Sequence, residues 1–94
     1  MLRWVVAYDV PDDRRRARLA LVLEDFGDRM QYSVFEVLAE GEDLATLRER
    51  IAGVIDPRED KVRFYALCDA CVEKAFDLGK VEGKAFDQPD VIIV

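Results

Sequence analysis

The chain opens with an almost unbroken apolar run over residues 2–8, which ends at the carboxylate of Asp9. The run is rich in β-branched and aromatic residues, so it predicts a strand that is buried on both faces at the centre of a sheet. Pro11 cannot continue the strand, because a proline has no backbone N–H to donate. Asp9 is therefore expected at the end of a central strand.

The next segment has the apolar spacing of a helix, with residues at i, i+3, i+4 and i+7: Leu19, Val22, Leu23 and Phe26. This spacing predicts an amphipathic helix over residues 13–26, with Asp12 able to cap its first turn. Glycine is common as the left-handed residue that closes a helix, so we expect that role for Gly27.

Further segments also have the composition of regular structure. Residues 29–38 are β-branched and aromatic, and the pattern alone does not decide between one bent strand and a tight hairpin. Apolar residues mark one face of a second helix, which starts near Asp43 and ends before Pro57: Leu44, Leu47, Ile51 and Ile55. Residues 62–68 and the apolar end at 91–94 predict two more strands.

The order of these elements predicts an α+β sandwich of the ferredoxin-like βαββαβ class, with an extra short C-terminal strand. In a single domain spanning residues 1–94, two helices can cover one face of a four-stranded sheet, and no third helix is left for the other face. A second protomer is the simplest cover, which predicts a homodimer. The apolar end at 91–94 would be an aggregation-prone edge unless it paired with a sheet, and donation to the partner's sheet is one hypothesis.

Composition restricts the possible chemistry. The chain has no histidine, which removes the most common general base and excludes Ser-His-Asp catalysis, Cys-His catalysis and histidine-ligated metals. The net charge of −6 argues against strong nonspecific binding of nucleic acid. However, residues 1–29 hold six arginines and six acidic residues, whereas residues 30–94 hold eight basic and fourteen acidic residues. Positive charge is thus concentrated in the first third, and weak or metal-dependent binding is expected.

No signal peptide or membrane span is visible, so a soluble cytoplasmic protein with no membrane partner is expected. Two cysteines are too few for a disulfide framework. Cys68 and Cys71 have the spacing of a redox pair or of half a zinc site, although Cys68 is also explained as a buried strand residue. The segment from Gly79 to Lys84 superficially resembles a phosphate loop, but no Ser or Thr follows its lysine and its glycines are too close together.

Asp9 and the arginines after it form the candidate site. A carboxylate is a hard oxygen ligand suited to Mg²⁺, and arginines present planar groups that match phosphate oxygens two at a time. The arginines follow closely in the sequence: Arg14, Arg15, Arg16 and Arg18. The combination predicts a site for a nucleic-acid backbone. The plain alternatives are that Asp9 is a turn residue and that the arginines, Arg14 and Arg15 in particular, lie on a solvated helix face.

Four segments carry a resemblance to a known family. They are Tyr-Asp-Val at 8–10, the acidic and basic residues that enter the predicted helix, Gly-Asp-Arg-Met-Gln-Tyr-Ser-Val-Phe-Glu at 27–36, and Arg-Phe-Tyr at 63–65. Together they resemble the Cas-two family of small CRISPR-associated endoribonuclease and adaptation subunits, over nearly the whole chain. The segment 27–36 is the most specific. Residues 86–91 also resemble the family's ending, which precedes a strand exchanged between protomers.

The resemblance implies a ferredoxin-like homodimer in which Asp9 of each protomer faces its twin and supports a divalent metal, usually Mg²⁺ or alternatively Mn²⁺. It also implies cleavage of single-stranded RNA or double-stranded DNA, and exchange or docking of residues 86–94 at the dimer interface. Matched residue by residue, the family's functional positions correspond to seven residues of this chain. The resemblance implies that each of them has a part in metal binding, in activity or in contact with the nucleic-acid backbone: Tyr8, Asp9, Arg16, Arg18, Arg29, Ser33 and Phe35. On pattern alone, Ser33 and Phe35 are instead turn and packing residues.

Three functional classes follow. The first is a metal-dependent endonuclease that takes part in spacer acquisition in antiviral defence through paired Asp9 residues. The second, which the resemblance also implies, is a non-catalytic dimeric scaffold that bridges two dimers of the Cas-one integrase on foreign DNA. The third is a toxin-like ribonuclease related by fold. The sequence leaves open whether this member cleaves, and whether two symmetric carboxylates share one metal.

Overall fold

The computed structural model describes residues 2–79, whose elements follow one another in the order βαββαβα. The strands are β1 (Arg3–Asp9), β2 (Gly27–Gln31), β3 (Val34–Leu38) and β4 (Lys61–Leu67), and the helices are α1 (Asp13–Glu24), α2 (Glu42–Ala52) and α3 (Asp69–Lys74). The predicted strand at 91–94 and the predicted exchange of residues 86–94 lie outside the described residues. Between residues 2 and 79, no helix is long and apolar enough to cross a membrane.

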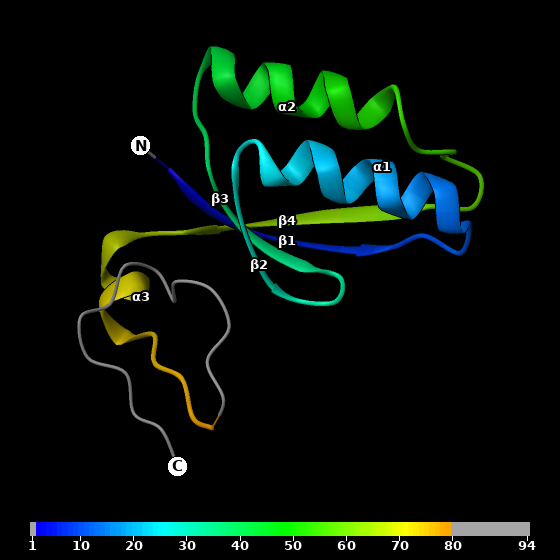
Figure 1. The fold of residues 1–94 in the computed structure, drawn as a ribbon. Coiled ribbons are helices and arrows are strands. Elements are labelled where there is room, and N and C mark those ends of the chain that lie inside the picture. Colours follow the sequence, from blue (N-terminus) through cyan, green and yellow to red (C-terminus); the bar gives the residue numbers. More distant parts are fainter. Residues whose placement is uncertain (1, 80–94) are drawn as a thin grey trace.

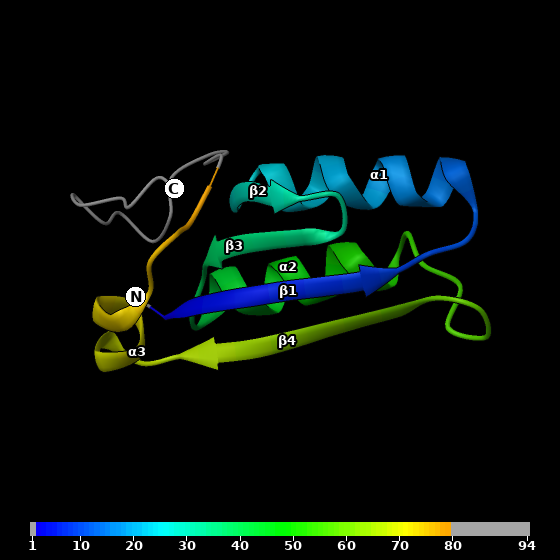
Figure 2. The same cartoon turned by 90° about the horizontal axis from the view of Figure 1, so that it is seen from below.

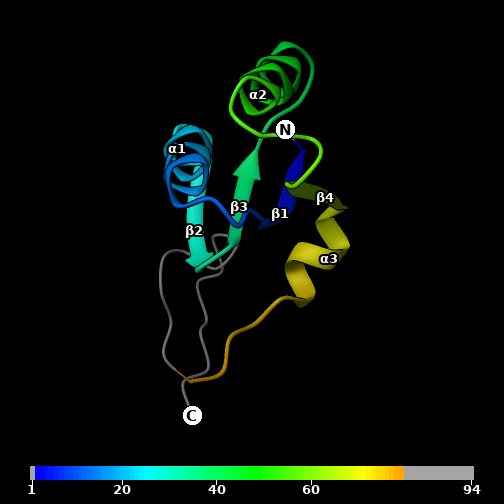
Figure 3. The same ribbon diagram turned by 90° about the vertical axis from the view of Figure 1, so that its right-hand side faces the viewer.

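The four strands form one antiparallel sheet in the order β2-β3-β1-β4. β1 lies between β3 and β4, as its apolar composition predicts. Helices α1 and α2 pack on one face of this sheet (Figure 1, Figure 3). This is the ferredoxin-like arrangement, so the predicted α+β class is confirmed.

The core lies between the sheet and these two helices. Val6 and Tyr8 of β1 and Phe35 of β3 point into it, and α1 contributes Leu19 and Leu23. Because side chains alternate along a strand, the remaining residues of β1, β3 and β4 project from the opposite face. Neither α1 nor α2 covers that face, which is seen in Figure 2 with the strands in front of the helices. We call it the open face of the sheet.

On the open face, β1 is less buried than its apolar sequence predicts. Val5 and Ala7 project from it and are half-buried. The predicted burial on both faces is therefore incomplete in the single chain. An additional cover over the open face would complete it.

One expectation about local structure is confirmed, and one alternative that the sequence left open is resolved. The backbone N–H of Arg15 donates to Asp12 Oδ1 at 2.9 Å, so Asp12 caps α1 as expected. Residues 29–38 contain a hairpin rather than one bent strand, because β2 and β3 pair antiparallel around a turn at Tyr32 and Ser33.

Two other expectations are wrong. Gly27 is not a left-handed residue that closes α1, since the helix ends at Glu24 and Gly27 begins β2 with an ordinary φ. The glycine is required for space, because a Cβ atom there would lie 1.8 Å from the carbonyl oxygen of Glu36. The helix α3 is absent from the sequence prediction, because Val72 is the one buried residue among its six and no apolar periodicity marks it.

Candidate functional site

Asp9 is the last residue of β1, and its side chain lies exposed on the open face. Among the described residues it makes no hydrogen bond or ion pair. The antiparallel register places Lys61 of β4 directly opposite Asp9, and Arg63 opposite Ala7. Directly opposed residues project from the same face of a sheet, so the carboxylate has basic side chains beside it on the neighbouring strand.

These residues line a groove of about 230 Å³ on the open face. Its lining comes from the ends of two neighbouring strands: Ala7, Tyr8, Asp9, Lys61, Arg63 and Tyr65. The Arg63 guanidinium lies over the Tyr65 ring, 5.9 Å from its centroid, and its Nη1 is 3.5 Å from the ring hydroxyl. The groove thus combines a carboxylate that can hold a cation with two basic side chains that can hold an anion.

The donor set of this groove limits how it can hold a metal. Within residues 2–79, no group of three or more Asp, Glu, His or Cys side chains is arranged to bind one. A lone carboxylate is a poor Mg²⁺ site, because the ion requires near-octahedral oxygen coordination. The set therefore fits a divalent ion when further oxygens are added, from a second Asp9, water or a substrate phosphate. Lys61 and Arg63 disfavour a bare cation and favour one that arrives with phosphate.

Most of the other predicted site residues gather on the helix-covered side of the sheet. There a cavity of about 330 Å³ lies between α1 and the turn of the β2–β3 hairpin, and we call it the hairpin cavity. Its lining includes four predicted residues and four others: Tyr8, Arg16, Arg29 and Ser33, with Asp13, Ala17, Ala20 and Tyr32. The structure thus divides the predicted site, with Asp9 on the open face and these four residues around the hairpin cavity.

Tyr8 is 7% exposed, and its hydroxyl donates to the carbonyl oxygen of Tyr32 at 3.2 Å. Burial raises the pKa of Tyr8 above its ordinary value, and the nearby charges of Arg29 and Arg16 oppose that rise without cancelling it. The phenol therefore stays protonated at neutral pH. It is a hydrogen-bond donor that holds the hairpin turn, and not a base.

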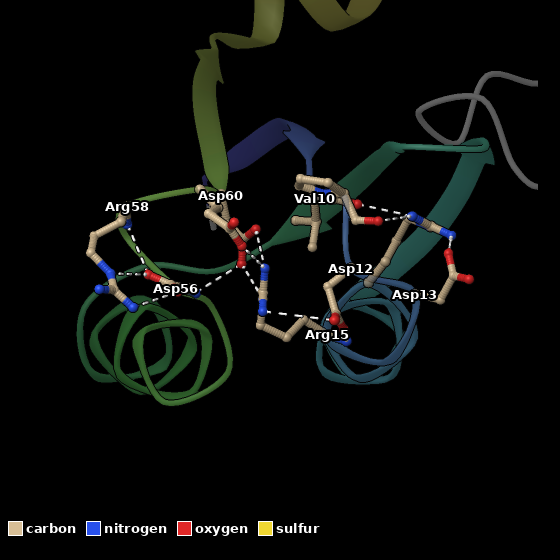
Figure 4. A network of polar contacts seen from close by, with 10 residues as sticks. Val10, Asp12, Asp13, Arg15, Asp56, Arg58 and Asp60 are labelled. Carbon is tan, nitrogen blue, oxygen red and sulfur yellow. Dashed lines mark hydrogen bonds and ion pairs between the residues drawn. The ribbon is translucent and has the colours of Figure 1, made fainter.

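The side chain of Arg16 binds neighbouring groups of the same chain. Its guanidinium donates to the carbonyl oxygen of Val10 at 2.9 Å and forms an ion pair with Asp13. Val10 and Asp13 are both labelled in Figure 4, where dashed lines mark these contacts. Arg16 thereby fixes the loop that directly follows Asp9. Arg18 differs, since it is exposed on α1, lines neither the groove nor the hairpin cavity, and has no ion pair or hydrogen bond in the described part of the chain.

Phe35 is fully buried and belongs to the core. Its ring centroid lies 6.3 Å from that of Tyr8, and the Arg29 guanidinium lies 5.3 Å from it on the side of the hairpin cavity. Phe35 therefore positions Tyr8 and Arg29 and has no surface for a ligand in the single chain. Ser33 lies in the hairpin turn, where its carbonyl oxygen accepts the Tyr8 backbone N–H at 3.1 Å.

Sequence reasoning did not assign Lys61, Arg63 or Tyr65 to the site, although Arg63 and Tyr65 belong to the motif at 63–65. They could be found from the register of the β1–β4 strand pair, because the first residue of β4 pairs with the last residue of β1. The expectation that Arg15 lies on a solvated face is wrong. Its Nε is 2.7 Å from Asp60 Oδ2, so it links α1 to the loop before β4 (Figure 4). Its immediate neighbour Arg14 is exposed, as expected.

Comparison with known proteins gives a consistent result. The family model described as CRISPR associated protein Cas2 matches residues 1–75. A curated relative from Thermus thermophilus, named CRISPR-associated endoribonuclease Cas2, is 41% identical over 94% of each chain. The crystal structure of Streptococcus pyogenes Cas2 aligns with a TM-score of 0.74 and 29% identity, over 82% of this chain and 99% of that one. A chain from a partial Cas6-RT-Cas1-Cas2 complex has a TM-score of 0.72 and 33% identity, over 82% of this chain and 90% of that one.

Proposed function

The chain belongs to the CRISPR-associated Cas2 family, and from this premise we propose that it is a metal-dependent endonuclease whose ion, Mg²⁺ or Mn²⁺, is held by Asp9. The match confirms the predicted family and the predicted CRISPR-associated nuclease class, with its role in spacer acquisition, and it sets aside the toxin-like alternative. The metal, the substrate and the residues that act on it make up the proposal.

One observation carries it: Asp9 is an exposed carboxylate without a partner among the described residues, in a groove that also holds Lys61 and Arg63. A surface carboxylate is satisfied by water alone, but Asp9 shares its groove with two basic side chains and forms an ion pair with neither of them. An acid that is left free beside two cations instead suits a ligand that carries both charges, namely a phosphodiester with its counterion. Single-stranded RNA and double-stranded DNA both present this group.

A homodimer would complete the site. The groove lies on the open face, which α1 and α2 leave uncovered (Figure 2). A two-fold interface pairs the same surface on both protomers, so docking through the open face brings the two grooves together. The second Asp9 would then supply the carboxylate that a single chain lacks. Exchange of residues 86–94 between protomers remains part of this proposal.

The chain's own residues have separate tasks in this proposal. Asp9 binds the ion, while Lys61 and Arg63 bind phosphate oxygens and stabilise the charge that builds on them. Arg16 positions Asp9 by holding the loop at Val10. A bound divalent ion would polarise the phosphoryl group and lower the pKa of an attacking water, which suits a chain without histidine.

The test is cleavage of labelled single-stranded RNA and double-stranded DNA, with Mg²⁺ or Mn²⁺ and with EDTA. We expect metal-dependent cleavage by the wild type and a fall of more than about 100-fold in the Asp9→Asn variant, because a metal ligand is lost. Asp43→Asn is the matched control, since Asp43 is exposed at the start of α2 on the other side of the sheet. Equal cleavage by wild type and Asp9→Asn, or none by either, would sink the catalytic proposal.

A second candidate function is the non-catalytic scaffold that bridges dimers of the Cas-one integrase, written Cas1 in the neighbouring complex. Arg18 favours it, because this side chain is exposed and free of partners within the described residues. In this role Arg18→Ala should weaken DNA binding and reduce the slope of log affinity against log salt by about 1, while Asp9→Asn leaves DNA binding intact. An Arg18→Ala variant with unchanged DNA affinity in the Cas1 complex would count against it.

A further inference from the structure

Cys68 and Cys71 lie where the chain leaves the sheet. β4 ends at Leu67, Cys68 is the N-cap of α3, and Cys71 lies in the first turn of that helix. Both cysteines are free and exposed. Their Sγ atoms are 3.3 Å apart, which is within contact distance of two sulfur atoms. Neither thiol has a part in the nuclease site.

We propose that Cys68 and Cys71 form a reversible dithiol–disulfide pair that is oxidised by low-molecular-weight disulfides. A disulfide joins its sulfur atoms at about 2.0 Å, so the two sulfur atoms, now 3.3 Å apart, need to approach by only about 1.3 Å. The backbone already holds them in one turn, because the N–H of Val72 donates to the carbonyl oxygen of Cys68 at 3.1 Å. Closure therefore needs no rearrangement of the sheet.

The surroundings of Cys68 favour its reaction. Hydrogen bonds from the backbone N–H and the thiol of Cys71 lower the pKa of the Cys68 thiol below its ordinary value. A lower pKa increases the thiolate fraction at neutral pH, and the thiolate is the nucleophile in disulfide exchange. Cys68 is therefore the attacking residue and Cys71 is the resolving one.

The exchange balances in two steps. The Cys68 thiolate attacks one sulfur of the small disulfide, forms a mixed disulfide and releases one small thiol. The Cys71 thiolate then attacks Cys68 Sγ, closes the Cys68–Cys71 bond and releases the second small thiol. Two electrons pass from the protein to the small disulfide, and the two cysteine protons are taken up by the released thiols.

A zinc site is less well supported by the same two residues. Tetrahedral zinc requires four ligands, and the part of the chain that the structure describes holds no group of three suitable side chains. A structural role in the core also fails, because both thiols are exposed. The pair lies at the opposite end of β4 from the proposed metal ligand Asp9, since Leu67 pairs with Arg3 while Lys61 pairs with Asp9. Oxidation should therefore leave the metal-dependent cleavage rate unchanged.

The test equilibrates the full-length protein with mixtures of reduced and oxidised glutathione, quenches with acid, alkylates free thiols with iodoacetamide and measures the intact mass. We expect reduced protein to take two labels and oxidised protein to take none, at the mass of one chain less two hydrogen atoms. The matched variants Cys68→Ser and Cys71→Ser should each stop at a mixed disulfide with glutathione, because the second thiol is missing.

Three outcomes would overturn the proposal. They are two alkylatable thiols in the presence of excess oxidised glutathione, a stable mixed disulfide on the wild type, and a disulfide-linked dimer on a non-reducing gel. Since both side chains are exposed, the serine variants should fold, and circular dichroism checks this. If either variant fails to fold, the wild-type result alone decides.

Discussion

At the scale of single residues, two neighbours in β1 serve opposite sides of the sheet. Asp9 is exposed on the open face, whereas Tyr8 is buried on the helix side and donates to the carbonyl oxygen of Tyr32. Burial raises the pKa of Tyr8, so its hydroxyl is a donor and not a base at neutral pH. In the proposed site Asp9 is the metal ligand, whereas Tyr8 supports the hairpin turn.

The Tyr8→Phe variant tests this division of roles. It loses one hydrogen bond, so we expect the free energy of unfolding to fall by about 1 kcal/mol. Metal-dependent cleavage should remain, with the same dependence on pH as in the wild type. Urea unfolding and the cleavage assay measure the two effects. A variant that is as stable as the wild type but does not cleave would show that the hydroxyl acts on the substrate.

Gly27 is required by the close approach of two backbones. A Cβ atom at this position would lie 1.8 Å from the carbonyl oxygen of Glu36, and the backbone of β3 cannot move aside cheaply. We expect Gly27→Ala to lower the free energy of unfolding by more than about 2 kcal/mol. Gly53→Ala is the matched control, because its nearest contact would be an ordinary 3.5 Å to the carbonyl oxygen of Arg50. Equal losses in urea unfolding of the two variants would rule out this explanation.

At the scale of elements, Arg15 links α1 to the loop before β4. It bonds Asp60 through Nε at 2.7 Å and Nη2 at 3.1 Å, and Glu59 through Nη2 at 2.9 Å (Figure 4). The Asp60 side chain has no exposed surface and also accepts the backbone N–H of Asp56 at 2.8 Å. The hydrogen bonds from Arg15 are the main cause of a lowered pKa at Asp60. This link sets where β4 begins, and hence where Lys61 meets Asp9.

The link should make stability depend on pH. The pKa of Asp60 is lower in the folded than in the unfolded chain, so the ionised carboxylate stabilises the fold. This contribution is complete above the pKa of Asp60 in the unfolded chain, about 4, and is lost as the pH falls through its pKa in the folded chain. At neutral pH the Arg15→Met variant should have a lower free energy of unfolding than the wild type. On acidification that free energy should fall by less than it does in the wild type. Asp12 and Asp56 also have lowered pKa values, so part of the acid sensitivity remains.

Urea unfolding at neutral and acidic pH measures both effects. Arg14→Met is the matched control, because the Arg14 side chain is exposed and makes no hydrogen bond or ion pair within residues 2–79. If the two variants had the same unfolding midpoints at both pH values, Arg15 would have no special part in holding the loop.

Periodicity predicts elements well where one side of the element is apolar. The apolar run of β1 and the helical spacing of α1 and α2 identify all three, although α1 ends at Glu24 and not at residue 26. Contacts between distant residues are not encoded in this way. Arg15 meets Asp60 across 45 positions of sequence, and Lys61 meets Asp9 through strand register. The acidic centre of the site was therefore predictable, while its basic partners required the fold.

At the scale of the whole molecule, the sheet has one face covered by helices and one face that bears the groove. The open face carries half-buried Val5 and Val34 beside Asp9, together with Tyr65, which is 50% exposed. A surface that mixes apolar and charged side chains suits an interface at which a site is completed by a partner. The proposed homodimer accounts for the apolar residues and for the isolated carboxylate together.

The most direct test of the shared site is a mixed dimer. Wild-type and Asp9→Asn chains with different affinity tags are co-expressed, and the dimer with one chain of each kind is purified and assayed for Mg²⁺-dependent cleavage. If two Asp9 carboxylates hold one site, the mixed dimer should be as inactive as the Asp9→Asn homodimer. A rate midway between those of the two homodimers would contradict the account, because each protomer would then carry a complete site of its own.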